Sequence, residues 1–296
     1  MSTVSRAGRP GFVWVAPAVT FFGLFALLPM LAVVYLSFTV YDGLNPPRWT
    51  GLDNWTRLTA DPLFVESLRL SFGLTFASWV LQTAVALPLG VWLAGRPRSR
   101  AVLAALFFVP LLMSSAAIAV LWGTLLDPNF GLASVLGPLI GIGDGNIIGD
   151  GRYAFAAVIL VIGWQYMPFH TLLYQAAARA IPAQLYEAAL IDGASRWRTF
   201  RSITVPQLRD TIITSGVLIV VGSMTTFEVV LILTDGGPGT ATRILPLHMY
   251  LQGFRSFDMG YASALAVVLL LLGTALSLLI ARVTGYRKMT SQREGM

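Results

Sequence analysis

Residues 262–281 read ASALAVVLLLLGTALSLLIA, twenty residues without one charged side chain. About 20 consecutive apolar residues are enough for one helix to cross the hydrocarbon core of a bilayer. Five further stretches are similarly long and apolar, so the sequence predicts an all-α polytopic membrane protein with six transmembrane helices. The expected spans are approximately residues 12–38, 68–94, 102–125, 155–178, 211–233 and 262–281.

The composition of the whole chain supports the same class. Of its 296 residues, 56% are apolar and only 11% are charged, whereas a soluble domain carries roughly 25% charged residues. The sequence has no cysteine, and its two histidines, His170 and His248, are far apart. We therefore expect no disulfide, no thiol nucleophile and no metal cluster. The predicted organisation is a single transmembrane domain over residues 1–296, without catalytic residues or enzymatic activity.

Basic residues are distributed unevenly over the loops, and this distribution predicts the orientation of the chain. Fourteen of the twenty lysines and arginines fall in the N-terminus, the 95–101 turn, the 179–210 loop or the C-terminal tail. Because cytoplasmic loops carry an excess of basic residues, we expect both termini in the cytoplasm. The net charge of +6 then reflects topology and not a nucleic-acid partner. The fourteen residues are Arg6, Arg9, Arg96, Arg98, Arg100, Arg179, Arg196, Arg198, Arg201, Arg209, Arg282, Arg287, Lys288 and Arg293.

The three loops on the other side are rich in glycine, proline, aspartate and asparagine. They cover about residues 39–67, 126–154 and 234–261, and this composition predicts turn-rich caps rather than domains. Aromatic residues near the ends of the spans are expected to form interfacial belts. These residues are Trp49, Trp55, Tyr153 and Tyr261.

The 179–210 loop, called the elbow below, has the most specific pattern in the chain. Pro182 is well placed to open a short helix, and Gly193 is a natural stop for it. A second short helix is expected to start at Ala194 or Ser195. The sequence thus predicts a helix–glycine–helix turn with a small-residue surface and an apolar face. The small residues are Ala188, Ala189, Gly193 and Ala194, and the apolar face holds Trp197, Phe200 and Ile203.

The residue order in the elbow resembles the signature of the integral-membrane subunits of binding-protein-dependent ABC importers. That signature is Glu-Ala-Ala, three residues, Gly and, further on, Ile-x-x-Pro-x-Leu. The chain also resembles the carbohydrate branch of the family (maltose and multiple-sugar permeases), although Asp210 stands where many relatives carry proline. The matching segments are Glu187-Ala188-Ala189, Gly193, Ile203-Thr204-Val205-Pro206-Gln207-Leu208, Asp192-Gly193-Ala194 with Trp197 and Phe200, and Leu233-Thr234-Asp235-Gly236-Gly237-Pro238-Gly239.

The resemblance implies the architecture of an ABC type I importer permease in a bacterial plasma (inner) membrane. A second homologous permease subunit pairs with such a chain around a central path, and two ATP-binding subunits dock from the cytoplasm. An extracytoplasmic solute-binding protein delivers the sugar. The chain lacks a Gly-x-x-x-x-Gly-Lys-Ser/Thr loop, so the partners bind ATP and Mg and this chain binds no cofactor. The residues implied at the ATPase contact are Glu187, Ala188, Ala189, Asp192, Gly193, Ala194, Trp197 and Phe200.

Two spans carry polar and aromatic groups suited to a sugar inside the membrane. By resemblance, these segments line the substrate path in sugar permeases. We expect Gln165, Tyr166 and Phe169 to share one face of the fourth span. In the fifth span, Gly222, Ser223 and Thr226 are expected to share a face, although small hydroxyl residues also serve helix packing. The full set of candidates is Trp164, Gln165, Tyr166, Phe169, Gly222, Ser223, Thr226 and Glu228.

Three other readings stay open at this point. A related permease could carry another solute such as glycerol phosphate or a polyol, although an anionic solute favours basic residues in the path. An ion-coupled secondary transporter should show several buried carboxylates or repeated halves with broken helices, and Glu228 is the one clear acid inside a span. A membrane enzyme would need clustered His, Asp or Glu at one face, and the sequence has no such cluster.

Overall fold

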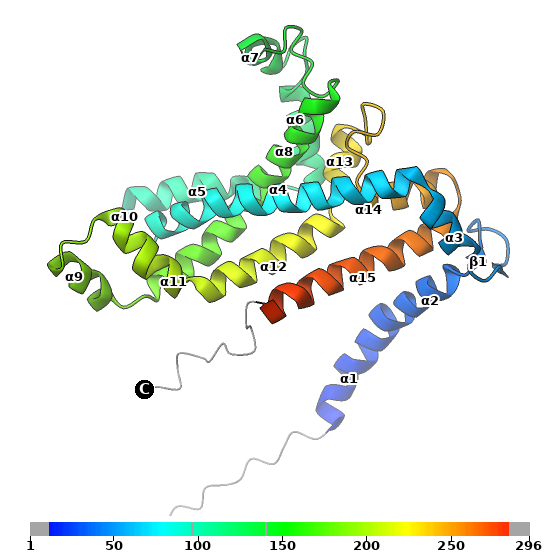
Figure 1. Cartoon of the computed structure of the whole chain (residues 1–296), viewed down its shortest axis with the longest axis horizontal. Coiled ribbons are helices and arrows are strands. Elements are labelled where there is room, and N and C mark those ends of the chain that lie inside the picture. Colours follow the sequence, from blue (N-terminus) through cyan, green and yellow to red (C-terminus); the bar gives the residue numbers. More distant parts are fainter. Residues whose placement is uncertain (1–11, 96–97, 140, 284–296) are drawn as a thin grey trace, which may run out of the picture. The chain divides into compact units, whose positions relative to one another are not determined.

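The computed structural model describes residues 12–95, 98–139 and 141–283, which fold into helices joined mostly by short loops (Figure 1). The chain forms two compact units. Unit 1 contains residues 12–61 and 249–268, and unit 2 contains residues 62–248 and 269–283.

The structure has four to six of the six predicted membrane segments, depending on whether each bent pair of helices is counted as one span. Four helices are long and apolar enough to cross a membrane without interruption, and two further segments are pairs of helices joined at a sharp bend. The uninterrupted segments are Trp14–Leu36, Pro62–Leu93, Gly151–Arg179 and Met259–Ile280; the bent pairs are Ala104–Leu112 with Ser115–Leu125, and Arg196–Gln207 with Arg209–Thr225.

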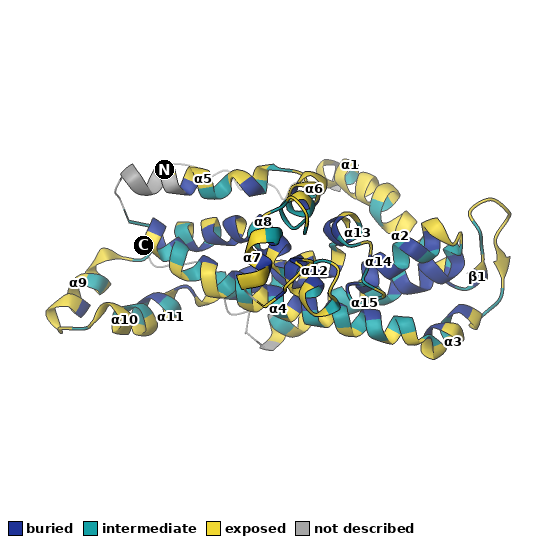
Figure 2. Ribbon diagram, turned by 90° about the horizontal axis from the view of Figure 1, so that it is seen from above, coloured by how far each residue is buried: buried dark blue, intermediate teal, exposed yellow. Residues whose placement is uncertain are grey.

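Unit 1 contains the first membrane segment and a small cap. The segment is largely exposed within the chain, as Figure 2 shows for its first and last parts. Two short strands pair antiparallel, with Thr39 opposite Trp49. The elements are α1 (Phe12–Phe22), the π-helical turn η1 (Gly23–Leu27), α2 (Leu28–Leu36), β1 (Thr39–Val40), β2 (Arg48–Trp49), α3 (Asp53–Ala60), η3 (Leu251–Arg255) and the start of α15 (Met259–Val283).

Buried polar contacts hold the cap of unit 1 together. The side-chain amide of Asn54 donates to the backbone carbonyls of Ser37 at 3.0 Å and Thr39 at 2.8 Å. The hydroxyl of Tyr261 donates to Asp61 at 2.7 Å, and this side chain is fully buried. The expectation that Tyr261 belongs to an interfacial belt is therefore wrong, because its ring packs inside the cap.

Unit 2 contains the remaining membrane segments and the elbow. Its elements are α4 (Pro62–Leu93), α5 (Arg98–Leu112), α6 (Ser115–Leu125), α7 (Ala133–Leu139), α8 (Gly151–Arg179), α9 (Ala183–Ile191), α10 (Arg196–Thr199), η2 (Phe200–Thr204), α11 (Val205–Gln207), α12 (Arg209–Thr225), α13 (Glu228–Leu233), the start of α14 (Leu245–Tyr250) and the end of α15.

The core of unit 2 is the pair α4 and α8, which approach closely at two glycines. A Cβ atom on Gly90 of α4 would lie 2.7 Å from the carbonyl oxygen of Thr171, and one on Gly163 of α8 would lie 2.8 Å from a methyl of Leu81. Small residues at such contacts let the backbones of membrane helices come together. This close pair is the scaffold against which α5 and α12 pack.

The third and fifth predicted spans are broken, which corrects the expectation of continuous helices over 102–125 and 211–233. The helix of the third span bends by 106° after Leu112, and Ser114 caps the new helix by accepting from the amide of Ala117 at 3.2 Å (Figure 1). The fifth span stops at Thr225, and Thr226 is extended, with φ −68° and ψ 127°. Glu228 therefore begins a new helix and does not continue the old one.

The orientation predicted from the basic residues remains a prediction, since no membrane is present in the structure. Six of the fourteen residues lie outside the described part of the chain. They are Arg6, Arg9, Arg96, Arg287, Lys288 and Arg293.

Candidate functional site

The elbow has the predicted helix–glycine–helix form. Helix α9 ends at Ile191, and Gly193 adopts a φ of +67°, a region that glycine enters without steric cost. The amide of Ala194 then donates to the carbonyl of Ala189 at 2.9 Å, which satisfies a helix end. Ser195 caps α10 by accepting from the amide of Arg198 at 3.3 Å. The chain thus turns sharply between two short helices.

The exposed surface of the elbow is larger and more apolar than the small residues suggest. Leu190 is 78% exposed, Ile191 is 86% exposed and Trp197 is 68% exposed. Ala189 is buried, so its expected place on the small-residue surface is wrong. Gly193 has open space around it, because a Cβ atom there would meet no atom within 4 Å.

Contacts within the elbow hold its two halves together. The rings of Trp197 and Phe200 stack with centroids 5.7 Å apart. The hydroxyl groups of Tyr186 and Thr204 lie 3.2 Å apart, which ties α9 to the helix that follows the turn. A groove of about 540 Å³ separates this face of the elbow from Pro88 and Trp92 of α4. Helix α12 (Arg209–Thr225) continues from the elbow after a 70° bend.

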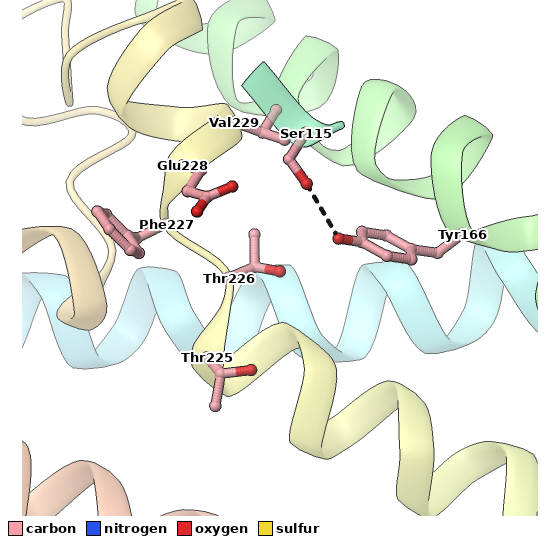
Figure 3. A pocket seen from close by; sticks show the side chains of 7 residues that line it. All are labelled: Ser115, Tyr166, Thr225, Thr226, Phe227, Glu228 and Val229. Carbon is pink, nitrogen blue, oxygen red and sulfur yellow. Dashed lines mark hydrogen bonds between the residues drawn. The ribbon is translucent and has the colours of Figure 1, made fainter. Parts of the chain in front are cut away.

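The two helix breaks line one polar cavity of about 230 Å³, called the Glu228 cavity (Figure 3). Helix α6 begins at Ser115, and α13 begins at Glu228. Helices α6 and α13 pack against each other and against α8. The residues that line the cavity are Ser115, Tyr166, Thr225, Thr226, Phe227, Glu228 and Val229.

Hydroxyl, amide and carboxylate groups gather around this cavity. The hydroxyl of Tyr166 lies 3.2 Å from the Oγ atom of Ser115 (Figure 3). Behind them, the side-chain amide of Gln165 donates to the same Oγ atom at 3.2 Å. Figure 3 shows the carboxylate of Glu228 and the hydroxyl of Thr226 directed toward the open space, whereas the ring of Phe227 points away. These groups can donate and accept hydrogen bonds inside a membrane segment.

A second cavity of about 360 Å³, called the His170 cavity, shares Tyr166, Thr225 and Thr226 with the first. His170 is buried, and its Nδ1 atom lies 2.8 Å from the Oγ atom of Ser215. This confirms the expectation that His170 is a packed residue. The remaining lining residues are Gln82, Leu111, Ile162, Phe169, Leu218, Ile219, Gly222 and Ser223.

Gln82 of α4 is the buried amide of the His170 cavity. Its side chain is 2% exposed, and none of the described residues hydrogen-bonds to its Oε1 atom. A buried acceptor without a partner costs about 1–3 kcal/mol. A hydroxyl of a molecule in the cavity could remove that cost by donating to this oxygen.

The structure brings most of the expected path residues together. Six of the eight line the two cavities: Tyr166, Phe169, Gly222, Ser223, Thr226 and Glu228. Thr226 does so from the break and not from a helix face shared with Gly222 and Ser223, which corrects the expected geometry. The other two candidates, Trp164 and Gln165, face neighbouring helices. The ring of Trp164 packs edge-on against Trp122 with centroids 5.5 Å apart.

Ser115 was missed by sequence reasoning. Ser115 lies in the middle of an uncharged apolar stretch, so hydropathy alone does not predict the helix break between Leu112 and Ser115. The Ser114-Ser115 pair was the available signal, because serine is a preferred residue at the start of a helix.

Comparisons with known proteins place this architecture in context. A family model described as "binding-protein-dependent transport system inner membrane component" matches residues 86–285. The diacetylchitobiose uptake system permease protein NgcF of Streptomyces coelicolor is 32% identical over 92% of this chain and 82% of its own. The trehalose/maltose transport system permease protein MalF of Thermococcus litoralis is 29% identical over 96% of both chains.

A solved structure has the same fold. The chain is similar to one in the crystal structure of a bacterial alginate ABC transporter in complex with an alginate pentasaccharide-bound periplasmic protein, with a TM-score of 0.81. The identity is 20%, and the match covers 95% of each chain. The likeness concerns the backbone arrangement, including the helices that surround the two cavities.

Proposed function

Because the chain belongs to the binding-protein-dependent transport system inner membrane component family, we propose that it forms part of the translocation path for a sugar. As a member of this family it is a multi-pass membrane permease subunit and not an enzyme, and ATP is handled by partner ATPase subunits. A second homologous permease subunit and two ATP-binding subunits complete the transporter in this proposal, and an extracytoplasmic binding protein delivers the sugar.

The observation that carries the sugar assignment is the set of groups around the two cavities. Tyr166, Thr226, Ser223 and Gln82 offer uncharged donors and acceptors, and Phe169 offers an aromatic surface for the apolar face of a sugar ring. Relatives named for trehalose/maltose and diacetylchitobiose uptake support the same class of substrate. Among the described residues that line the cavities, none is lysine or arginine, which disfavours an anionic solute such as glycerol phosphate.

The elbow is proposed as the contact with the ATPase subunits. Its exposed Leu190, Ile191 and Trp197 form an apolar projection of the kind that a partner protein buries. Glu187, Asp192 and Gly193 lie beside that projection, while Ala189 supports it from inside. Closure of the ATPase subunits would move the elbow and, through the bend at Leu208, tilt α12. The break at Thr226, at the end of α12, would then move relative to α8 and open the cavities to alternate sides.

Uptake by the reconstituted complex tests this function. Proteoliposomes that hold the permease pair, the ATPase subunits and internal ATP are supplied with the binding protein and labelled maltose, diacetylchitobiose or glycerol 3-phosphate. We expect accumulation of a saccharide that requires ATP and persists when a protonophore collapses the proton gradient. Accumulation of glycerol 3-phosphate alone, or uptake driven by the gradient without ATP, would contradict the proposal.

A further inference from the structure

An apolar groove of about 500 Å³ lies between α4, α12 and the end of α15, and all its lining residues belong to unit 2. Each helix contributes residues at helical spacing, so each presents one continuous face to the groove. On α4 these are residues 72, 75, 76 and 79. The groove shares no lining residue with the Glu228 or His170 cavity; its Val220 on α12 adjoins Ile219, which lines the His170 cavity. Its apolar walls include Phe72, Phe76, Ile213, Val220, Leu276 and Ile280.

The wall between α4 and α12 depends on one glycine. The Nε1 atom of Trp79 would lie 3.3 Å from a Cβ atom on Gly216. The indole can therefore lie directly against the backbone of α12, where it closes one side of the groove. A larger residue at position 216 would push this ring or fill the space.

One arginine lies just beyond the groove residues on each of α12 and α15. Arg209 is the first residue of α12, and it precedes Ile213, Gly216 and Val220 by four, seven and eleven positions. At 3.6 residues per turn, this spacing places all four on one face of the helix, whereas Asp210 is rotated from it by about 100°. On α15, Arg282 lies in the last turn, three positions after Leu279 of the groove. Both arginines are exposed.

The length of the groove matches one leaflet of a bilayer. From Arg209 to Val220 the helix rises about 16 Å at 1.5 Å per residue. The hydrocarbon core is about 30 Å thick, so one leaflet is about half of that. A chain of hydrocarbon that lies in the groove would therefore reach from the arginines to the middle of the membrane.

From these observations we propose that the groove binds an acyl chain of an anionic phospholipid, and that Arg209 and Arg282 bind its headgroup phosphate. The apolar walls exclude a polar ligand, and two positive charges at one end favour a negative headgroup over a zwitterionic one. Long arginine side chains can extend from the end of a span to the headgroup region. The predicted orientation places this end at the cytoplasmic leaflet, where anionic lipids are concentrated.

Lipid retention by the purified full complex tests the site. Native mass spectrometry counts bound lipids after incubation with phosphatidylglycerol or phosphatidylcholine of identical acyl chains. We expect several-fold preferential retention of phosphatidylglycerol. In the double variant Arg209→Gln/Arg282→Gln the two lipids should be retained about equally, because each arginine removed should lower the preference for phosphatidylglycerol about fivefold. The control variant Arg152→Gln changes an exposed arginine at the start of α8 and should retain the preference.

A second pair of variants tests the groove itself. Gly216→Leu should reduce retention of both lipids. Leu279→Trp should do the same, and since Leu279 is exposed this variant should fold normally. Equal retention of the two lipids by the wild type, or an unchanged preference in the double arginine variant, would overturn the proposal. A photoreactive amino acid at Leu279 should crosslink to lipid; crosslinking to another protein subunit instead would assign the groove to that subunit.

Discussion

The hydroxyl of Tyr166 lies 3.2 Å from the Oγ atom of Ser115, a residue 51 positions earlier in the chain. This contact joins the continuous helix α8 to the first residue of α6, just after the helix has bent by 106°. It therefore couples an unbroken membrane helix to a broken one at the edge of the Glu228 cavity. A change in that contact should alter the affinity for a molecule bound in the cavity.

The first prediction concerns the tyrosine hydroxyl. Tyr166→Phe keeps the ring and removes one hydrogen-bonding group. Since one such bond contributes about 1 kcal/mol, the sugar concentration for half-maximal uptake should rise about fivefold. Uptake titrations measure it. The control Trp164→Phe changes a ring on the same helix that packs against Trp122 and should leave the titration unchanged. Identical titrations for Tyr166→Phe and wild type would remove Tyr166 from the proposed path.

The second prediction concerns the buried amide of Gln82. Gln82→Leu removes an acceptor that has no partner among the described residues. The purified complex should therefore unfold at the same or a higher temperature, while sugar uptake falls several-fold. Gln175→Leu is the matched control on α8, because its amide donates to the carbonyl of Leu93 at 3.0 Å. That variant should be less stable but keep its sugar affinity. Normal uptake by Gln82→Leu would mean that Gln82 has only a packing role.

The third prediction concerns the carboxylate of Glu228, which opens α13 at the edge of the cavity. Glu228→Gln keeps the shape and removes the charge. If ATP drives transport, the variant should still require ATP and should still ignore a protonophore, although its affinity for sugars can change. Uptake in vesicles with imposed proton gradients provides the measurement. Gradient-driven uptake that is present in the wild type and lost in the variant would favour an ion-coupled carrier.

The fourth prediction concerns topology. The sequence has no cysteine, so a single introduced cysteine reports its own position. Asn45 lies in the exposed loop between β1 and β2, and Gln184 is exposed on α9 of the elbow. In intact cells, a membrane-impermeant thiol reagent should label Asn45→Cys and leave Gln184→Cys unlabelled until the cells are opened. The reverse pattern would invert the orientation predicted from the arginines.

Hydropathy and residue order were sufficient for the membrane segments and for the elbow. The length of an apolar run predicts a membrane segment. Pro182 and Gly193 predict a short helix between them, because proline and glycine act through local backbone geometry. The start of α9 at Ala183 and the positive φ of Gly193 follow from such local rules.

The breaks at Ser114 and Thr226 could not be predicted in the same way. Ser114 lies in an uncharged stretch, and Thr226 lies in a stretch whose one charged residue is Glu228. The helices that begin after the breaks, α6 and α13, pack against each other and against α8. Gln165 donates to Ser115 from a position 50 residues away. Burial of Tyr261 and Ala189 likewise depends on tertiary packing, which the local pattern does not contain. Six candidate path residues nevertheless meet at the cavities, because polar groups inside a membrane segment tend to face an interior space.

ATP hydrolysis by complexes that carry Gly193→Asp tests the coupling role of the elbow most directly. A side chain at Gly193 meets no atom of this chain within 4 Å, so the variant should insert and fold, with about 1 kcal/mol or more of strain from the positive φ. Gly193→Asn is the matched control, because it has nearly the same size and no charge. We expect Gly193→Asp to lose ATP hydrolysis stimulated by the sugar-loaded binding protein, together with co-purification of the ATPase subunits, and Gly193→Asn to lose less. Wild-type stimulation and co-purification in Gly193→Asp would contradict the assignment of the elbow as the ATPase contact.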